Sequence, residues 1–136
     1  MANPINLEVL TPSREVLHET CDDVYLPGPR GEFGVLPDHV GLISALAIGE
    51  LRYRRGSTTK TLAVRGGFAQ ILENQVIVLA DQCVEPQEVS KPALEKERKE
   101  IDEKMLDRAI GIEDRGKLVL DRAWVEARLS LLKATL

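Results

Sequence analysis

The stretch GEFGVLPDHVGLISAL, residues 31–46, combines three glycines, a proline, a histidine and two acidic residues with large aliphatic side chains. Short apolar runs closed by proline and glycine, such as EFGVLP, are typical of strands. Segments that connect strands are normally polar, because they run over the surface. The stretch therefore predicts a β-rich region, and its apolar connecting segment requires a separate explanation.

Residues 1–86 carry the same β signature on either side of this stretch. Ile5, Leu7 and Val9 alternate with polar positions, which is the period of a half-buried strand. Two hairpins are expected, the first turning at residues 55–57 and the second at residues 73–75. Turn signals recur about every eight to twelve residues without a βαβ alternation, which favours an antiparallel sandwich or barrel.

The character of the chain changes near Pro86. Residues 87–136 hold eleven acidic and eleven basic residues, so the whole net charge of −4 belongs to residues 1–86. Apolar residues in this second part recur at helical spacing. We therefore expect two domains, a β domain over residues 1–86 and a pair of helices over residues 87–136.

The first helix is expected to follow Ser90, which can cap it, with Pro92 in its first turn. A narrow apolar stripe follows at helical spacing, formed by Leu94, Ile101, Met105 and Ile112. A break is expected over residues 111–116. Asp114 is a plausible cap there for a second helix that runs from about Lys117 toward the C-terminus.

The second helix carries two apolar stripes on roughly opposite faces. One stripe consists of Leu120, Trp124, Ala127 and Leu131, and the other of Leu118, Val125, Leu129, Leu132 and Leu136. A hairpin of two helices can bury only one of these stripes between its members. The other stripe needs a second surface, which is either the β domain of the same chain or another protein.

Composition argues against several classes of protein. The net charge of −4 is unfavourable for non-specific nucleic-acid binding. Cys21 and Cys83 lie far apart without CxxC spacing, which favours two reduced, buried thiols over a metal or redox site. No apolar run reaches the roughly 18 residues of a membrane span, and the opening MANPINLEV lacks the pattern of a secretory signal.

The usual catalytic motifs are missing as well. The sequence contains no HExxH, GxSxG or Walker A pattern, and the glycines of PGPRGEFG and VRGGF lack the spacing of a phosphate-binding loop. Neither His18 nor His39 has an evident catalytic partner. We therefore expect no enzymatic activity, no metal and no cofactor for the isolated chain.

Two stretches resemble the epsilon subunit of the bacterial rotary F-type ATP synthase. GEFGVLPDHVGLISALAIGEL is similar to that family's pattern G-x-[FL]-G-[IV]-x-P-x-H, and AVRGGFAQILENQVIVLADQC to its second signature, a GGF hairpin followed by V-x-V-L-A-D. The order of parts and the length fit too, so the resemblance covers the whole chain. It implies an N-terminal antiparallel β-sandwich followed by a C-terminal two-helix antiparallel hairpin.

The resemblance implies a non-catalytic central-stalk (rotor) subunit of a proton- or sodium-translocating ATP synthase, peripheral on the cytoplasmic face of the bacterial inner membrane. The family's sandwich joins the gamma subunit to the c-ring. Its hairpin lies against the sandwich or extends toward the alpha and beta subunits, where it inhibits ATP hydrolysis. An apolar segment with glycines suits such docking, because glycines allow close backbone approach and aliphatic side chains bury area.

The resemblance also assigns contact residues. Glu32 matches the family's acid at the c-ring contact, and His39 matches its histidine near gamma. Without the resemblance, an exposed turn acid and a packed loop histidine are the simpler interpretations. The family commonly has PGHAPLL where this chain has PDHVGLI, so Asp38 replaces a glycine and Gly41 a proline. We expect this departure to cause a local change only.

Arg115, Arg122 and Lys133 fall together on the flank of the leucine stripe of the second helix. The resemblance implies that they contact an acidic segment of beta in the extended, inhibiting state, with the leucine stripe packing on gamma or beta beside them. Ordinary solvated surface charge is the alternative interpretation. We expect these three side chains to face away from the seam between the two helices.

Some members of the family bind ATP through an [IL]-D-x-x-R-A motif at the start of the first helix. The corresponding stretch here is VSKPAL, residues 89–94, which lacks both the acid and the arginine. We therefore expect no ATP site. The competing class of protein is a free-standing adaptor or chaperone-like binding module built from the same two parts.

Overall fold

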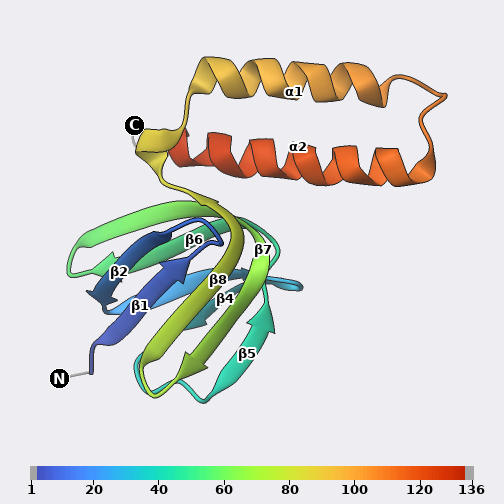
Figure 1. Cartoon of the computed structure of the whole chain (residues 1–136). Helices are drawn as coiled ribbons and strands as arrows, with labels where there is room; N and C mark the ends of the chain where they lie inside the picture. The colour runs from blue at the N-terminus through green and yellow to red at the C-terminus, as the bar shows by residue number, and fades with distance from the viewer. Residues whose placement is uncertain (1–2, 134–136) are drawn as a thin grey trace.

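A computed structural model describes residues 3–133, and its strands fill the chain as far as Val84 (Figure 1). The strands are β1 (Ile5–Leu10), β2 (Glu15–Cys21), β3 (Asp23–Gly28), β4 (Gly31–Val35), β5 (Leu42–Ala45), β6 (Ile48–Arg55), β7 (Thr58–Leu72) and β8 (Gln75–Val84). A 3-10 turn, η1 (Pro86–Glu88), leads into helices α1 (Lys91–Met105) and α2 (Ile112–Lys133). The predicted β-sandwich followed by a helical hairpin is confirmed.

The strands are ordered β2-β1-β8-β7-β6-β3-β4, and β5 pairs with β7. Pairing is antiparallel as predicted, except that β1 runs parallel to β8. The two predicted hairpins join β6 to β7 and β7 to β8. Their turns lie at residues 56–57 and 73–74, inside the predicted positions.

The long strand β7 contributes to both layers of the sandwich. Its first part pairs with β6 and its last part with β5, in one continuous register. Between these parts lie Gly66 and Gly67, with φ angles of 65° and 103° that favour glycine. Leu46 N–H donates to Gly67 O at 2.9 Å, which fixes the crossing from β5 to β6 opposite the glycines. β7 curves as a result (Figure 1).

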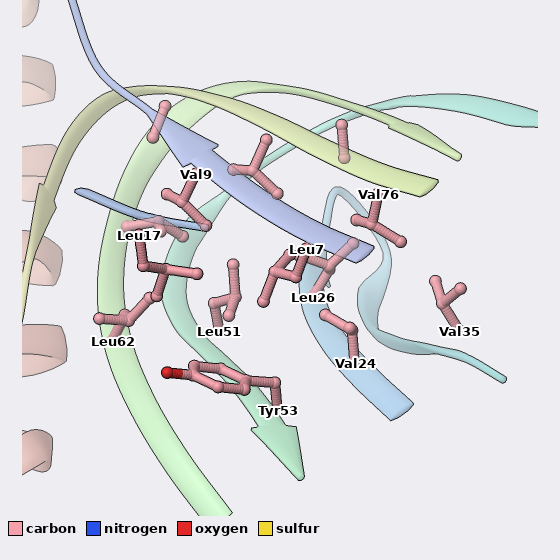
Figure 2. Packing of buried hydrophobic residues seen from close by; sticks show 14 of the residues in the cluster. Leu7, Val9, Leu17, Val24, Leu26, Val35, Leu51, Tyr53, Leu62 and Val76 are labelled. Carbon is pink, nitrogen blue, oxygen red and sulfur yellow. The ribbon is translucent and has the colours of Figure 1, made fainter. Parts of the chain in front are cut away.

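The core lies between the two layers and is mostly aliphatic, with Tyr53 among its buried side chains (Figure 2). Ile5, Leu7 and Val9 are fully buried, so the predicted alternation in the first strand is confirmed. Cys21 and Cys83 are buried and unpaired, also as predicted. Burial raises the pKa of the Cys21 thiol to about 11 and that of Cys83 to about 12, so both stay neutral near pH 7.

The predicted start of the first helix is confirmed, and the predicted start of the second helix is wrong. Ser90 is the N-cap of α1, and its hydroxyl accepts from Ala93 N–H at 3.4 Å. The predicted break over residues 111–116 is wrong, because α2 begins at Ile112 and includes Gly116. Asp114 therefore lies in the first turn, where an acidic side chain interacts favourably with the helix dipole. Ile112 is 93% exposed and does not belong to the stripe of α1.

Helix α2 lies between α1 and the sandwich, so both of its apolar stripes are covered within the chain (Figure 1). Trp124, Ala127 and Leu131 pack against Ala63 and its neighbours on the sandwich. The second stripe packs against Leu94 and Ile101 of α1 through Leu118, Val125, Leu129 and Leu132. Leu120 departs from the prediction, since it is about half exposed. Leu136 lies outside the described residues.

Candidate functional site

Four large apolar side chains lie exposed on the outer surface of β5, β7 and β8. Ile43, Phe68, Leu72 and Leu79 are each more than half exposed, and we call this group the outer apolar face. Strand alternation explains it, because Ala69 between Phe68 and Gln70 points into the core. Phe68 pairs directly with Leu79, which brings two strands of the face together.

The loop of residues 36–41 continues this apolar surface. Leu36 and Val40 are exposed, Val40 to 77%. A Cβ at Gly41 would lie 3.4 Å from Leu72 Cδ1, so the loop lies directly beside the outer apolar face. Contiguous exposed apolar surface marks an interaction site more reliably than a single exposed leucine does. Within residues 31–46, Val35 and Leu46 belong to the core, whereas the apolar side chains of the loop and of Ile43 form part of an exposed surface.

His39 is half-buried within this loop. Its Nδ1 lies 2.6 Å from Val40 O, and its backbone N–H donates to Leu36 O at 3.2 Å. A carbonyl oxygen only accepts, so Nδ1 carries the proton of the bond and Nε2 is the acceptor atom of the neutral ring. His39 is thus a half-buried loop histidine next to an exposed apolar surface, and its contact with gamma stays a prediction.

Glu32 lies on β4 beside the turn from β3, opposite Pro27. Its carboxylate accepts a hydrogen bond from Arg52 of β6, whose guanidinium stacks 5.0 Å from the centroid of the Tyr25 ring. Nearly half of the Glu32 side chain remains exposed. Glu32 and His39 therefore have different surroundings, and the structure does not join them into one site.

Two of the three predicted basic residues lie on the seam between the helices, so the expectation that they face away from it is wrong. Arg122 pairs with Asp102 of α1 at 3.0 Å. Arg115 donates to Met105 O at 3.0 Å and to Asp107 O at 3.1 Å, at the C-terminal end of α1. The reason is that the leucine stripe packs on α1, which places its flank at the edge of the seam. Lys133 is exposed.

Sequence reasoning missed the ionic contacts that hold the hairpin in place. Arg65 of β7 pairs with Asp121 of α2 at 2.8 Å. Arg14, which follows β1, donates to both carboxylate oxygens of Glu88 in η1, at 2.7 and 2.9 Å. Such pairs join residues more than 50 positions apart, and no local spacing reveals them. The stacking of Arg128 on Trp124, four residues apart in α2, does follow a helical spacing that is visible in the sequence.

Among residues 3–133, no cluster of three His, Cys, Asp or Glu side chains is arranged to hold a metal ion. The same residues contain no helix with the length and hydropathy needed to cross a membrane. An open cleft between η1 and β6–β7 is lined by side chains of both charges, including Glu19, Lys60 and Glu85.

The structure is a β-sandwich with an exposed apolar face and a docked helical hairpin. Residues 4–86 match the family described as ATP synthase, Delta/Epsilon chain, beta-sandwich domain. The ATP synthase epsilon chain of Syntrophobacter fumaroxidans is 39% identical over 136 residues, covering 99% of this chain and 100% of that protein. That of Solibacter usitatus is 37% identical over 134 residues, 96% of each. The chain belongs to the family of ATP synthase epsilon chains.

Solved structures share the fold. A chain of the Euglena gracilis mitochondrial ATP synthase, solved as OSCP/F1/c-ring in rotational state 1, superposes with a TM-score of 0.81 at 22% identity. The match covers 97% of this chain and 81% of that chain, so it includes the helices. A chain of the Tetrahymena thermophila central stalk/c-ring structure gives a TM-score of 0.61 at 14% identity, covering 99% and 98%. At these identities the likeness shows the fold alone.

Proposed function

We propose that this chain is the non-catalytic central-stalk (rotor) subunit of a rotary ATP synthase. It couples the gamma subunit to the c-ring and inhibits ATP hydrolysis through its C-terminal helices. The observation that carries the proposal is the match to bacterial epsilon chains over 99% of this chain. The printed titles of the structural neighbours name F1, the central stalk and the c-ring, which supports the same assembly. The subunit acts peripherally, on the cytoplasmic face of the bacterial inner membrane.

The gamma subunit docks on the outer apolar face and the adjoining loop, where His39 lies. Covering a large aliphatic or aromatic side chain gains about 1.5–3 kcal/mol relative to full exposure. Four side chains that are each more than half exposed therefore offer enough free energy for a specific contact. The turn from β7 to β8, next to Leu72, lies at the end of the sandwich away from the helices, so docking leaves the hairpin free (Figure 1).

Glu32 supplies the contact with the c-ring. Its carboxylate lies at a strand end and is partly exposed, and Arg52 orients it from the neighbouring β6. A carboxylate held in this way can accept further hydrogen bonds from polar groups of a partner, because an ionised carboxylate offers about four acceptor positions. Residues 1–86 thus form the docking domain, and residues 87–136 form the regulatory domain.

Inhibition requires α2 to leave the sandwich and bind elsewhere. Release exposes Trp124, Ala127 and Leu131, which then need a new apolar partner. In that state Arg115, Arg122 and Lys133 contact the acidic segment of beta. Because Arg122 pairs with Asp102 in the docked hairpin, this contact requires Arg122 to exchange partners. Reversing Arg122 and Lys133 to Glu should relieve inhibition and also weaken the seam, whereas Asp102→Asn weakens the seam alone and serves as the control.

Co-purification with gamma tests the docking assignment. A tagged chain should recover gamma in stoichiometric amount, and Phe68→Glu on the outer apolar face should abolish recovery. Leu120→Glu is the matched control, because Leu120 is about as exposed as Phe68 but lies on α2. Recovery of diverse proteins instead of gamma would favour a free-standing binding module. Equal loss of gamma with both variants would count against the outer apolar face.

A further inference from the structure

The loop of residues 36–41 begins with a turn that usually requires glycine. His39 N–H donates to Leu36 O at 3.2 Å, which closes a four-residue turn with Pro37 second and Asp38 third. Asp38 has a φ of 63°. A turn with proline second and a positive φ third is of type II, where glycine or asparagine is preferred at the third position. Aspartate is unusual there, and its conformation needs support from elsewhere.

That support comes from Asn74 in the turn between β7 and β8. Asp38 N–H donates to Asn74 Oδ1 at 2.6 Å, and Asn74 Nδ2 donates back to Asp38 Oδ1 at 3.0 Å. We call these two bonds the Asp38–Asn74 clasp. Asn3 Nδ2 adds a third bond to the same carboxylate oxygen at 3.3 Å. The bonds from Asn74 and Asn3 lower the pKa of Asp38, so its carboxylate is an ionised acceptor at neutral pH.

The clasp joins two parts of the exposed apolar surface. On one side it fixes the turn that presents Leu36, His39 and Val40. On the other side it is anchored in the β7–β8 turn, where Asn74 O also accepts from Asn6 N–H of β1 at 2.8 Å. Leu72, a member of the outer apolar face, immediately precedes that turn. The loop and the face therefore keep one relative position before any partner binds.

We propose that the Asp38–Asn74 clasp pre-organises the loop of residues 36–41 for the gamma subunit, which makes Asp38 and Asn74 positioning residues for that contact. The inference rests on the proposed function for the identity of the partner. A loop that is ordered before binding avoids the entropy cost of ordering it in the complex, so the affinity is higher. The clasp also lets this chain use aspartate where the turn geometry favours glycine.

Calorimetric titration of the purified chain with gamma tests the proposal. Asn74→Gly removes both bonds of the clasp, whereas Asp38→Gly removes only the carboxylate acceptor and keeps the backbone N–H that donates to Asn74 Oδ1. Neither variant adds strain, because glycine accepts a positive φ. Asn74→Gly should weaken the Kd on the order of tenfold and Asp38→Gly by less, since the apparent Kd rises as the binding-competent fraction falls. The double variant should be no weaker than Asn74→Gly, because that single change already deletes both bonds. Asp38→Asn, which keeps the acceptor oxygen, should restore most of the affinity.

Glu73→Gly is the matched control for these variants. Glu73 shares the turn with Asn74 and also has a positive φ, of 51°, but it makes neither bond of the clasp. Its replacement should leave the Kd unchanged. The thermal midpoint of every variant shows whether the sandwich is still folded.

Hydrogen exchange of the free chain separates this inference from the proposed function. The Asp38 amide should be protected in the wild type and in Glu73→Gly, and should lose protection in Asn74→Gly. Unchanged exchange in Asn74→Gly, or unchanged gamma affinity in both glycine variants, would overturn the role of the clasp. A wild-type chain that does not bind gamma at all would overturn the proposed function, and with it the partner assigned to the loop.

Discussion

Arg65 on β7 and Asp121 on α2 form an ion pair of 2.8 Å that joins the sandwich to the hairpin, and their side chains are only 26% and 28% exposed. A partly buried pair of this kind is less screened by water and salt than a surface pair. It lies beside the contact that Trp124, Ala127 and Leu131 make with Ala63. The docked position of the hairpin thus depends on apolar packing and on long-range ionic contacts, of which this pair is one.

Removing this pair should release the hairpin more often. We expect Asp121→Ala to weaken docking by about 1 kcal/mol, the upper range for exposed pairs and below that for fully buried ones. Trp124 is the single tryptophan of the chain and is 6% exposed, so its emission reports docking. The emission should shift to longer wavelength in Asp121→Ala. Asp102→Ala, which removes a more exposed pair within the hairpin, should leave it unchanged.

If the Trp124 emission of Asp121→Ala stayed at the wild-type wavelength, apolar packing would hold the hairpin without this ion pair. The charge-swapped pair, Arg65→Asp with Asp121→Arg, provides a further check. The double variant should dock its hairpin more tightly than either single reversal does, as measured by the Trp124 emission.

Gly67 should tolerate no side chain. A Cβ at this position would lie 1.9 Å from Leu79 O, and the φ of 103° is itself unfavourable for other residues. Gly67→Val should therefore lower the free energy of unfolding by about 1 kcal/mol or more, the scale of a strained backbone position. Urea denaturation measures the change.

Gly116→Ala is the informative comparison. Gly116 lies inside α2, and beyond the adjoining helix backbone nothing lies within 4 Å of the point that a Cβ would occupy. Alanine there should raise stability by about 0.8–1 kcal/mol, the difference in helix propensity. If both glycine variants changed the denaturation midpoint alike, the conformation of β7 would not be the cause.

The sequence predicted the elements whose signals are local. Ile5, Leu7 and Val9 alternate along one strand, the β6–β7 turn contains Gly56, and Ser90 caps its own helix, so short windows suffice to find them. The start of α2 was missed because Gly111 and Gly116 resemble a helix break. The structure places Gly116 within the helix, where exposed glycine costs only about 1 kcal/mol.

The site was predicted less completely, because its geometry depends on contacts between distant residues. The contact roles of His39 and Glu32 were assigned from motifs and stay predictions, whereas the clasp that joins Asp38 to Asn74 spans 36 positions and has no local signal. The flank of the leucine stripe was identified correctly, yet its orientation depends on which surface covers the stripe. The structure covers it with α1, which turns Arg115 and Arg122 toward the seam.

Acid should loosen the connection between the sandwich and the hairpin. Hydrogen bonds from Arg14 lower the pKa of Glu88 in η1. A hydrogen bond from the backbone of Glu85 and the positive charge of Arg14 lower this pKa further. A lowered pKa in the folded state adds stability above the ordinary carboxyl pKa, and this stability is lost as pH falls through the lowered value. The thermal midpoint of the wild type should therefore exceed that of Glu88→Gln near pH 7. The gap should close toward pH 3, and a gap that stays constant would exclude this carboxylate as the cause.

The sandwich should fold without its helices. Its main core cluster draws only on residues from Ile5 to Cys83, and the outer apolar face lies in the same part of the chain. A chain truncated after Pro86 should be soluble, show β-type circular dichroism and still bind gamma. Its thermal midpoint should fall, because Ala63 and neighbouring side chains lose their cover from Trp124 and Leu131. A truncated chain without β structure would show that the helices are needed to fold the sandwich.

ATP hydrolysis by the reconstituted enzyme tests the proposed inhibitory role most directly. The alpha, beta and gamma subunits are combined either with the full chain or with the chain truncated after Pro86, and gamma binding is measured in the same samples. We predict that both chains bind gamma and that hydrolysis is faster with the truncated chain, because the proposed inhibition depends on residues 87–136. Equal hydrolysis rates with equal gamma binding would contradict an inhibitory role for the helices.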